Sequence, residues 1–414
     1  MCDSNFHDAM KNHVKGLPSE IKNTQSYDLR KEEVSLPCAT LKKSAVKHNI
    51  EWMQDFANHF DVLLAPHGKT SLTTEILKQQ VEAGAWGITV ASIQQAYVAK
   101  RAGAKRIILA NQLVGKTNFE LAAKLMDEVE LYVCVDSVKN IDDLSRFFES
   151  HTQPLSVLIE FGVSGGRCGV RNEKEVRQLI DEIAKSEGLT LHGIEFYEGV
   201  IHGTNEENEV RQFLSDVSNL FMTLDSESVF DTDNPIITGA GSAWYDVVTE
   251  TFLLMPSHFR KIIRPGCYVS HDKGIYQVAQ SKVLARIAQS EKLAFDMDSD
   301  LQSAIEVWAY AQSRPETNRV IVALGKRDVA FDTDLPILER VYRDGQLIEI
   351  DTQLTKTTDV MDQHMFLQVK ESCPIEVGDT LVFSTSHPCI TFDKWRYIAV
   401  CEDGIATHWM KTDF

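Results

Sequence analysis

Short apolar segments alternate with amphipathic segments between residues 62 and 263 of the chain. The apolar segments are rich in Ile and Val, and Gly, Asn, Asp or Pro usually follows them. Such near-continuous apolar runs are typical of strands that are covered on both faces of a parallel sheet. The pattern predicts strands at 62–65, 87–91, 106–110, 131–135, 156–160, 191–196, 235–238 and 261–263.

The segments between these runs repeat their apolar residues every three or four positions, which is the period of a helix with one buried face. The predicted helices cover 72–81, 93–99, 119–126, 138–148, 173–186, 206–224 and 243–254. A doubly wound open sheet also alternates strands with helices. Eight regular units nevertheless favour an α/β fold that closes into a (β/α)8 barrel.

The pattern changes near Arg264-Pro265-Gly266, after which short alternating segments predict a β domain, with a hairpin turn at Asp344-Gly345. Its strands are expected at 275–279, 304–310, 319–323, 337–341, 347–350, 365–369, 380–383 and 397–400. We therefore expect an N-terminal arm at 1–35, a barrel at 36–265 and a C-terminal β domain at 266–414. The arm is expected to join the β domain.

Composition and charge exclude several classes of function. The chain has 42 Lys and Arg against 60 Asp and Glu, a net charge of −18, whereas nucleic acids and anionic membranes bind clustered cations. No segment approaches the roughly 18 apolar residues of a membrane-spanning helix, and the N-terminus lacks the pattern of a secretory signal. The eight cysteines are scattered without a CxxC pair, so we expect a reducing, cytoplasmic setting.

Candidate chemistry begins after the first predicted strand, because active sites of such barrels lie at the C-terminal ends of the strands. Pro66-His67-Gly68-Lys69-Thr70 stands at that position. A lysine that is desolvated at the barrel mouth loses its proton more easily and can form a Schiff base with an aldehyde cofactor. From the residue type alone, a solvated loop lysine remains the alternative.

This segment resembles the lysine signature of the D-threonine aldolase/D-serine dehydratase family, a branch of the alanine-racemase-like enzymes that use pyridoxal phosphate. The resemblance continues in order from Leu36-Pro37 to Trp395. It implies an alanine-racemase-like barrel that binds pyridoxal 5'-phosphate. In that barrel Lys69 is the catalytic Schiff-base lysine, and His67 belongs to the cofactor-binding residues.

Three residues at later strand ends match cofactor-binding positions of the family. The resemblance implies that Gln112 faces the cofactor, although Asn111 beside it can simply close a turn. Arg167 lies in a segment similar to the racemase-type Gly-x-x-x-Arg-x-Gly, which implies contact with the cofactor's phenolic oxygen or the substrate carboxylate; a surface ion pair is the alternative. Tyr197 matches a tyrosine near the pyridine nitrogen, and a core tyrosine is its alternative.

Two glycine-containing segments are expected to hold the cofactor phosphate. Gly239, Gly241 and Ser242 follow the seventh predicted strand and precede a helix, where free backbone N–H groups form an anion site. Barrels frequently bind phosphate in the loops after strands seven and eight. After the eighth strand, the amides of Gly266 and Cys267 are expected to complete the site, in a segment that resembles the family's Arg-Pro-Gly-x-Tyr.

A candidate metal pair lies far downstream, at His387-Pro388-Cys389. Residues two apart on an extended strand point the same way, so an imidazole and a thiolate can share one ion. A turn histidine and a buried cysteine are the alternative. The stretch to Trp395 resembles the family's His-Pro-Cys-x-Thr-Phe-Asp-Lys-Trp, which implies a catalytic metal. Zinc suits the thiolate, whereas manganese prefers oxygen ligands.

The resemblance implies a lyase that acts on small D-β-hydroxy amino acids. D-Threonine aldolases of the family carry Asp where this chain has Cys389, which favours dehydration of D-serine to pyruvate and ammonia. Retro-aldol cleavage of D-threonine to glycine and acetaldehyde is the alternative. A non-catalytic pyridoxal-phosphate-binding regulator and an amino-acid racemase are further alternatives. The resemblance also implies a homodimer, in which one chain's β domain closes the partner's barrel.

Overall fold

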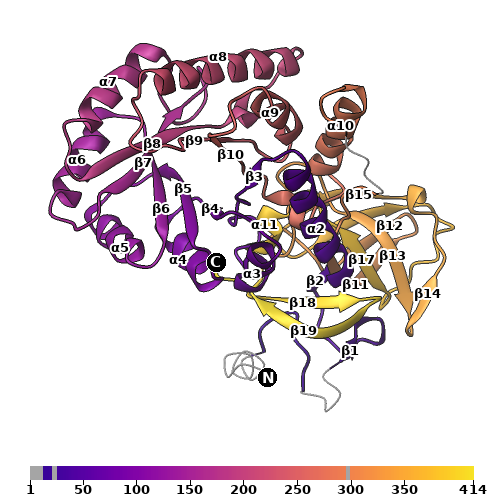
Figure 1. Ribbon diagram of the computed structural model, residues 1–414. Helices are drawn as coiled ribbons and strands as arrows, with labels where there is room; N and C mark the ends of the chain where they lie inside the picture. The colour runs from indigo at the N-terminus through magenta and orange to yellow at the C-terminus, as the bar shows by residue number, and fades with distance from the viewer. Residues whose placement is uncertain (1–12, 21–25, 295–298) are drawn as a thin grey trace.

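The computed structural model describes residues 13–20, 26–294 and 299–414. Its larger part is a barrel of eight parallel strands within these residues, in the order β3-β10-β9-β8-β7-β6-β5-β4 (Figure 1). The strands are β3 (Leu63–Leu64), β4 (Ile88–Val90), β5 (Arg106–Gln112), β6 (Glu130–Val135), β7 (Leu155–Phe161), β8 (Leu189–Phe196), β9 (Ile236–Gly239) and β10 (Arg260–Ile263).

Backbone hydrogen bonds beyond the end of β3 close the barrel. The Trp86 N–H donates to the Leu64 carbonyl (2.8 Å), and the Thr89 N–H donates to the Pro66 carbonyl (2.9 Å). In return, the Gly68 N–H donates to the Thr89 carbonyl (2.7 Å). The predicted closed barrel is therefore confirmed over the open sheet.

A layer of helices covers the outside of the barrel (Figure 1). Polar side chains fix several helix starts: Ser92, Ser137 and Asn172 each accept a hydrogen bond from the amide three residues further on. The helices are α2 (Lys43–His59), α3 (Thr74–Glu82), α4 (Ile93–Arg101), α5 (Lys116–Met126), α6 (Val138–Phe148), α7 (Glu173–Ile183), α8 (Glu206–Ser226) and α9 (Tyr245–Phe252). In the described residues, no helix has the length and apolarity needed to cross a bilayer.

Apolar residues pack on both sides of the barrel wall, which explains the near-continuous apolar runs in the sequence. The larger cluster fills the space between the strands and the helices and includes Ile107, Leu109 and Val133. A smaller cluster contains the alternate residues of the same strands, such as Ile108 and Leu158. The wall is thus buried on both faces, and polar residues gather beyond the strand ends.

The second part of the molecule is a sheet that has eleven strands within the described residues. β1 and β2 from the N-terminal part of the chain belong to it, and β2 pairs with β11 and β18. The division at residues 35 and 265 remains a prediction. The strands are β1 (Tyr27–Asp28), β2 (Cys38–Lys42), β11 (Ile305–Glu316), β12 (Arg319–Val322), β13 (Ile337–Arg343), β14 (Gln346–Ile348), β15 (Thr355–Val360), β16 (Met365–Val369), β17 (Thr380–Ser384), β18 (Tyr397–Glu402) and β19 (Ile405–Lys411).

The segment expected as a strand at 275–279 is instead the start of helix α10 (Ile275–Gln289), so that prediction is wrong. The carboxylate of Asp272 accepts hydrogen bonds from the amides of Gly274, Tyr276 and Gln277, which are the orphan donors of a helix start. Burial at Gln280, Val283 and Ile287 then follows the helical period. This helix brings its first turn to the mouth of the barrel.

The end of the chain attaches the β domain to the barrel. The Asp413 carboxylate pairs with Arg101 of α4 and accepts a hydrogen bond from Thr74 of α3. The Asp413 N–H donates to the Leu72 carbonyl (2.8 Å), and Figure 1 shows the C-terminus between these two helices. The β domain is thereby held next to the loop that carries Lys69.

Candidate active site

A cavity of about 330 Å³ opens at the C-terminal ends of the barrel strands. Tyr276 of α10 and two residues of the β domain close one side of it. Gln112 and Gly239, which the sequence also nominated, are not among its lining residues. The predicted residues that line it are His67, Lys69, Arg167, Tyr197, Gly241, Ser242, Gly266, Cys267, His387 and Cys389.

Lys69 lies in the loop after β3, where the backbone packs tightly against the loop after β10. A Cβ at Gly266 would lie 2.7 Å from the His67 carbonyl oxygen and 2.8 Å from Thr70 Oγ1, so this contact requires glycine. The tight backbone leaves the Lys69 side chain projecting into the mouth, where it is exposed. The desolvation expected at the barrel mouth is therefore not provided by the described residues of this chain.

His67 presents a neutral imidazole to the cavity. Burial, followed by the positive charges of Lys69, Arg264 and Arg167, holds its pKa well below the ordinary value. Its Nδ1 atom is buried and has no hydrogen-bond partner among the described residues. This atom is available to a polar group of a bound molecule.

Arg167 and Tyr197 form one unit at the cavity wall. The Arg167 guanidinium lies 4.4 Å from the centre of the Tyr197 ring, which is cation–π distance. A Cβ on Gly241 would lie 2.9 Å from this ring, so the glycine makes room for it. Burial and then the charge of Glu198 raise the pKa of Tyr197 to about 12, which keeps the phenol protonated near neutral pH.

The expected phosphate site divides into two parts. The amides of Gly266 and Cys267 both donate to Ser242 Oγ (3.2 Å each), so these three groups converge. In contrast, the amides of Ala240 and Gly241 donate to the buried carboxylate of Glu198. Gly239 has a packing role, because a Cβ there would lie 2.1 Å from the Phe196 ring.

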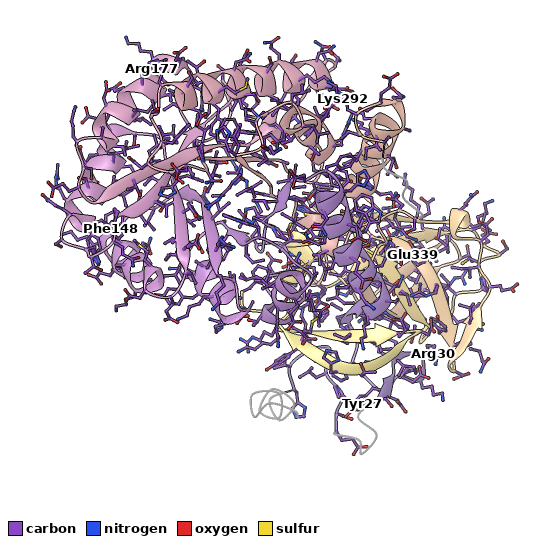
Figure 2. All side chains as sticks on the ribbon, viewed as in Figure 1. Tyr27, Arg30, Phe148, Arg177, Lys292 and Glu339 are labelled. Atoms are coloured by element: carbon purple, nitrogen blue, oxygen red, sulfur yellow. The ribbon has the colours of Figure 1, made fainter. Side chains whose placement is uncertain are left out.

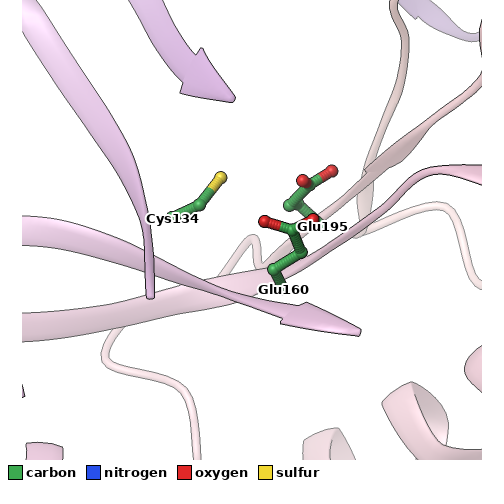
Figure 3. A group of neighbouring side chains, drawn as sticks. All are labelled: Cys134, Glu160 and Glu195. Atoms are coloured by element: carbon green, nitrogen blue, oxygen red, sulfur yellow. The ribbon is translucent and has the colours of Figure 1, made fainter. Parts of the chain in front are cut away.

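Gln112 points into a buried acidic cluster below the cavity. Its amide donates to Glu160 (2.6 Å), and Glu195 is paired with Arg264. The ligand-type atoms of Cys134, Glu160 and Glu195 lie within 4.8 Å of one another (Figure 3). Burial, and then the charge of Glu195, raises the pKa of Glu160 to about 7. The two carboxyl groups can therefore lie close together without a metal ion, because Glu160 can carry a proton and Arg264 neutralises Glu195.

The metal candidates lie at the β-domain side of the cavity. Cys389 begins a short helix, α11 (Cys389–Phe392), so the prediction that the pair lies on an extended strand is wrong. The two side chains still meet: burial lowers the pKa of His387, but the Cys389 thiolate and the Asp332 carboxylate raise it to about 9. His387 Nδ1 lies 2.7 Å from Asp332 Oδ2, which leaves Nε2 for a cation.

Comparison with known proteins assigns the family. Residues 41–269 match the family model described as the alanine racemase N-terminal domain. The chain belongs to this family. Residues 304–401 match a second model, described as a putative serine dehydratase domain. Together the two matches confirm the predicted membership in the D-threonine aldolase/D-serine dehydratase branch of the pyridoxal-phosphate enzymes of this fold type.

Relatives and solved structures span nearly the whole chain. A D-threonine aldolase of Arthrobacter sp is 25% identical over 90% of each chain. The structure of D-threonine aldolase from Filomicrobium marinum has a TM-score of 0.75 at 21% identity and covers 92% of this chain and 95% of its own. D-Threo-3-hydroxyaspartate dehydratase from Delftia sp. HT23 has a TM-score of 0.70 at 18% identity, with 93% and 98% covered. A cysteine-to-alanine variant of a D-threo-3-hydroxyaspartate dehydratase, described as being in the metal-free form, has a TM-score of 0.68 at 18% identity and covers 93% of this chain and 99% of its own.

The residues of this alanine-racemase-family chain fit pyridoxal phosphate. The cavity of about 330 Å³ is within the usual range for small-molecule sites. Lys69 supplies an amine, Ser242 and two convergent amides supply phosphate donors, and His67, whose buried Nδ1 has no partner among the described residues, lines the same cavity. A soft cation fits His387 and Cys389 equally well, because the Asp332 carboxylate orients the imidazole as in known zinc sites.

Several residues of the site were missed by sequence reasoning. Tyr276 was hidden by the wrong strand prediction, although Asp272 two residues before Gly274 is a recognisable helix-start signal. Glu198 directly follows Tyr197, but the sequence does not show that its carboxylate receives the amides of residues 240 and 241. Asp332 gave no signal, because it lies 55 residues from His387 in the sequence.

The contact between Asp332 and His387 predicts a measurable role in metal binding. Replacing Asp332 by Asn should weaken the affinity for zinc about 10–100-fold, because the carboxylate fixes the orientation and basicity of the imidazole. Competition with a chromophoric chelator measures this change. Asp334→Asn, two residues away, is the control, and equal affinities of both variants would contradict the role of Asp332.

The ion pair between Arg264 and Glu195 predicts a large effect on stability. Both side chains are buried, so Arg264→Met leaves an uncompensated carboxylate and should lower the free energy of unfolding by about 3–5 kcal/mol. Urea unfolding measures this change in the free energy of unfolding. Arg177→Met is the control, because Arg177 pairs with Glu227 on the exposed outer face of the barrel (Figure 2). A comparable loss in both variants would contradict the prediction.

Proposed function

We propose that this chain is a lyase that depends on pyridoxal phosphate and a divalent metal and that converts D-serine to pyruvate and ammonia. One observation carries the proposal: Lys69 and the pair His387 and Cys389 line the same cavity, although 318 positions separate Lys69 from His387. An amine for the cofactor and soft ligands for a metal therefore face a common space. The full-length similarity to aldolases and dehydratases that act on D-β-hydroxy amino acids supports the lyase class.

Six of the lining residues have a role in this reaction. Pyridoxal phosphate supplies an electron sink for the negative charge that develops at the substrate Cα. Lys69 Nζ holds the cofactor and afterwards accepts the Cα proton. Ser242 Oγ and the amides of Gly266 and Cys267 bind the phosphate. Arg167, held on the Tyr197 ring, contributes the positive charge for the phenolic oxygen or the substrate carboxylate.

The metal is proposed to be zinc. A divalent ion lowers the cost of the leaving β-hydroxyl group. Cys389 is a soft ligand that zinc accepts and manganese does not prefer. The hydrogen bond network already favours the thiolate: the contact with Cys267 lowers the pKa of Cys389, against the effect of burial, and His387 lowers it further. The metal-free structure of the related cysteine variant supports a cysteine ligand.

The charges of the cavity favour a substrate with one carboxylate. Within the described residues of this chain, the cations that line the cavity include Lys69, Arg167 and Arg264. Lys69 is committed to the cofactor, and Arg264 is paired with Glu195. Arg167 remains for a single carboxylate, so D-serine and D-threonine fit better than 3-hydroxyaspartate, the substrate in the names of several relatives.

Retro-aldol cleavage of D-threonine is the second candidate. The similarity to D-threonine aldolase over 90% of both chains favours it. The same amine and metal serve either reaction, and the outcome depends on whether the C–O bond or the Cα–Cβ bond breaks. Cys389, where the aldolases of the family carry Asp, is the feature that places dehydration first.

We also propose a homodimer in the cytoplasm. Three exposed apolar side chains stand near residues of the site in the sequence: Val114 (59% exposed) is three positions from Asn111, Val278 (60%) is two from Tyr276, and Phe331 (42%) is next to Asp332. A second chain over the mouth would cover such residues and also desolvate Lys69. The described cysteines are free, which agrees with a reducing compartment.

Product analysis tests the function. Purified protein, loaded with pyridoxal phosphate, is incubated with D-serine or with D-threonine, with and without added zinc. Pyruvate from D-serine that increases with zinc is the expected result. Acetaldehyde from D-threonine without pyruvate from D-serine would favour the aldolase, and turnover of neither substrate would overturn the proposal.

A further inference from the structure

Cys267 and Cys389 bring their sulfur atoms together at the edge of the cavity. Their Sγ atoms are 3.4 Å apart, although 122 positions separate the residues in the sequence. Cys267 lies in the loop after β10, and Cys389 begins α11 of the β domain. The hydroxyl of Thr70 is near both sulfur atoms, at 3.7 Å and 3.5 Å. The distance is too long for a disulfide bond, so both cysteines are free.

The contact between the two sulfur atoms matters because His387 and Cys389 are a small set of ligands for a metal ion. His387 and Cys389 alone give an ion two protein ligands, whereas catalytic zinc usually has three, with the fourth position open to water or substrate. Two Cys and one His form one of the established catalytic donor sets. A third ligand from the same cavity would complete such a set.

We propose that Cys267 is this third ligand, so that the chain binds zinc through His387, Cys389 and Cys267. The proposal rests on the metal site of the proposed function but on no particular substrate. Two sulfur atoms bound to one tetrahedral zinc, each at about 2.3 Å, lie about 3.8 Å apart. The observed 3.4 Å is within a few tenths of an ångström of that separation.

The surroundings of Cys267 suit a ligand. The side chain is 4% exposed, yet it lines the cavity together with Cys389 and His387. Cys389 contacts Cys267 and forms a hydrogen bond with His387, so its sulfur lies between the other two ligands. Two thiolates and a neutral imidazole carry a charge of −2, which balances a divalent cation in a site that holds few other ligands.

The proposal also connects the metal to the phosphate site. The Cys267 amide donates to Ser242 Oγ (3.2 Å), while its side chain faces Cys389. An ion bound by the sulfur therefore restrains the backbone that holds the phosphate. Metal-loaded protein should accordingly release pyridoxal phosphate more slowly than metal-free protein.

Cobalt and zinc binding test the ligand without any substrate. Metal-free protein that retains its cofactor is titrated with Co²⁺, whose charge-transfer absorption grows with the number of bound thiolates. Cys267→Ser and Cys389→Ser should each lose about half of the wild-type intensity, and Kd for zinc should rise at least tenfold. Cys168→Ser is the control, because Cys168 is a half-buried cysteine outside the cavity lining, and it should resemble the wild type.

X-ray absorption of the zinc-loaded wild-type protein gives a measurement that no folding defect affects. Two sulfur neighbours at about 2.3 Å are expected. One sulfur neighbour, with unchanged cobalt absorption in Cys267→Ser, would overturn the proposal and leave Cys267 as a hydrogen-bonding neighbour of Cys389. Two sulfur neighbours in a protein that fails to convert D-serine would support the ligand while rejecting the proposed reaction.

Discussion

Replacing Lys69 by alanine is expected to abolish the covalent attachment of pyridoxal phosphate and nearly all activity. Lys69 is the lysine of the cavity, and its loop is held by the contact with Gly266 and by the hydrogen bonds that close the barrel. Loss of a positioned base alone costs about 10²–10⁴-fold in rate. The visible absorption that the cofactor acquires on attachment to a lysine should disappear, and the rate of pyruvate formation should fall by at least this factor.

A nearby lysine provides the matched control for Lys69. Lys78 lies on the exposed face of α3, where its side chain is 62% exposed and pairs with Glu82. Lys78→Ala should therefore retain the absorption and the activity. A Lys69→Ala protein that keeps the visible band would show that another lysine carries the cofactor, and the assignment of this cavity would fail.

The barrel could be predicted from the sequence because its strands are buried on both faces. Ile107, Ile108 and Leu109 of β5 are all inaccessible or nearly so, and such runs stand out from polar surroundings. The β domain offered weaker signals. β15 (Thr355–Val360) is largely exposed and polar, so a search for apolar runs passed over it. In α10, the helix-start role of Asp272 outweighed the β-branched and aromatic residues Ile275, Tyr276 and Val278.

The parts of the site that could be predicted on the barrel are those where position at a strand end and the family resemblance agree. Lys69, Arg167 and Tyr197 each stand just beyond a strand end, and all three line the cavity. Contacts between distant segments could not be predicted in this way. Whether Glu198 or a phosphate receives the amides of residues 240 and 241 depends on how two loops meet. The approach of Cys267 to Cys389 depends on how the β domain docks on the barrel.

Removal of the metal is expected to abolish the reaction while the cofactor stays attached. Treatment with a strong chelator should lower D-serine dehydration at least 100-fold, because the β-hydroxyl is a poor leaving group without a bound cation. Attachment of the cofactor at Lys69 should persist, because Ser242 and the amide of Gly266 hold its phosphate without a metal ligand, and only the restraint on the Cys267 amide is lost. Added zinc should restore the rate, and manganese should restore less of it.

The dehydration rate and the attachment of the cofactor together distinguish a metal that takes part in the reaction from one that only supports the fold. If the ion only held the β domain on the barrel, chelation would lower the thermal midpoint and release the cofactor along with the activity. The domains are also joined by the contacts of Asp413 with Arg101 and of His408 with Glu75, which do not depend on a metal. Unchanged dehydration in protein shown to be metal-free would contradict the role given to His387 and Cys389. Loss of activity with an intact cofactor band would instead place the ion at the substrate.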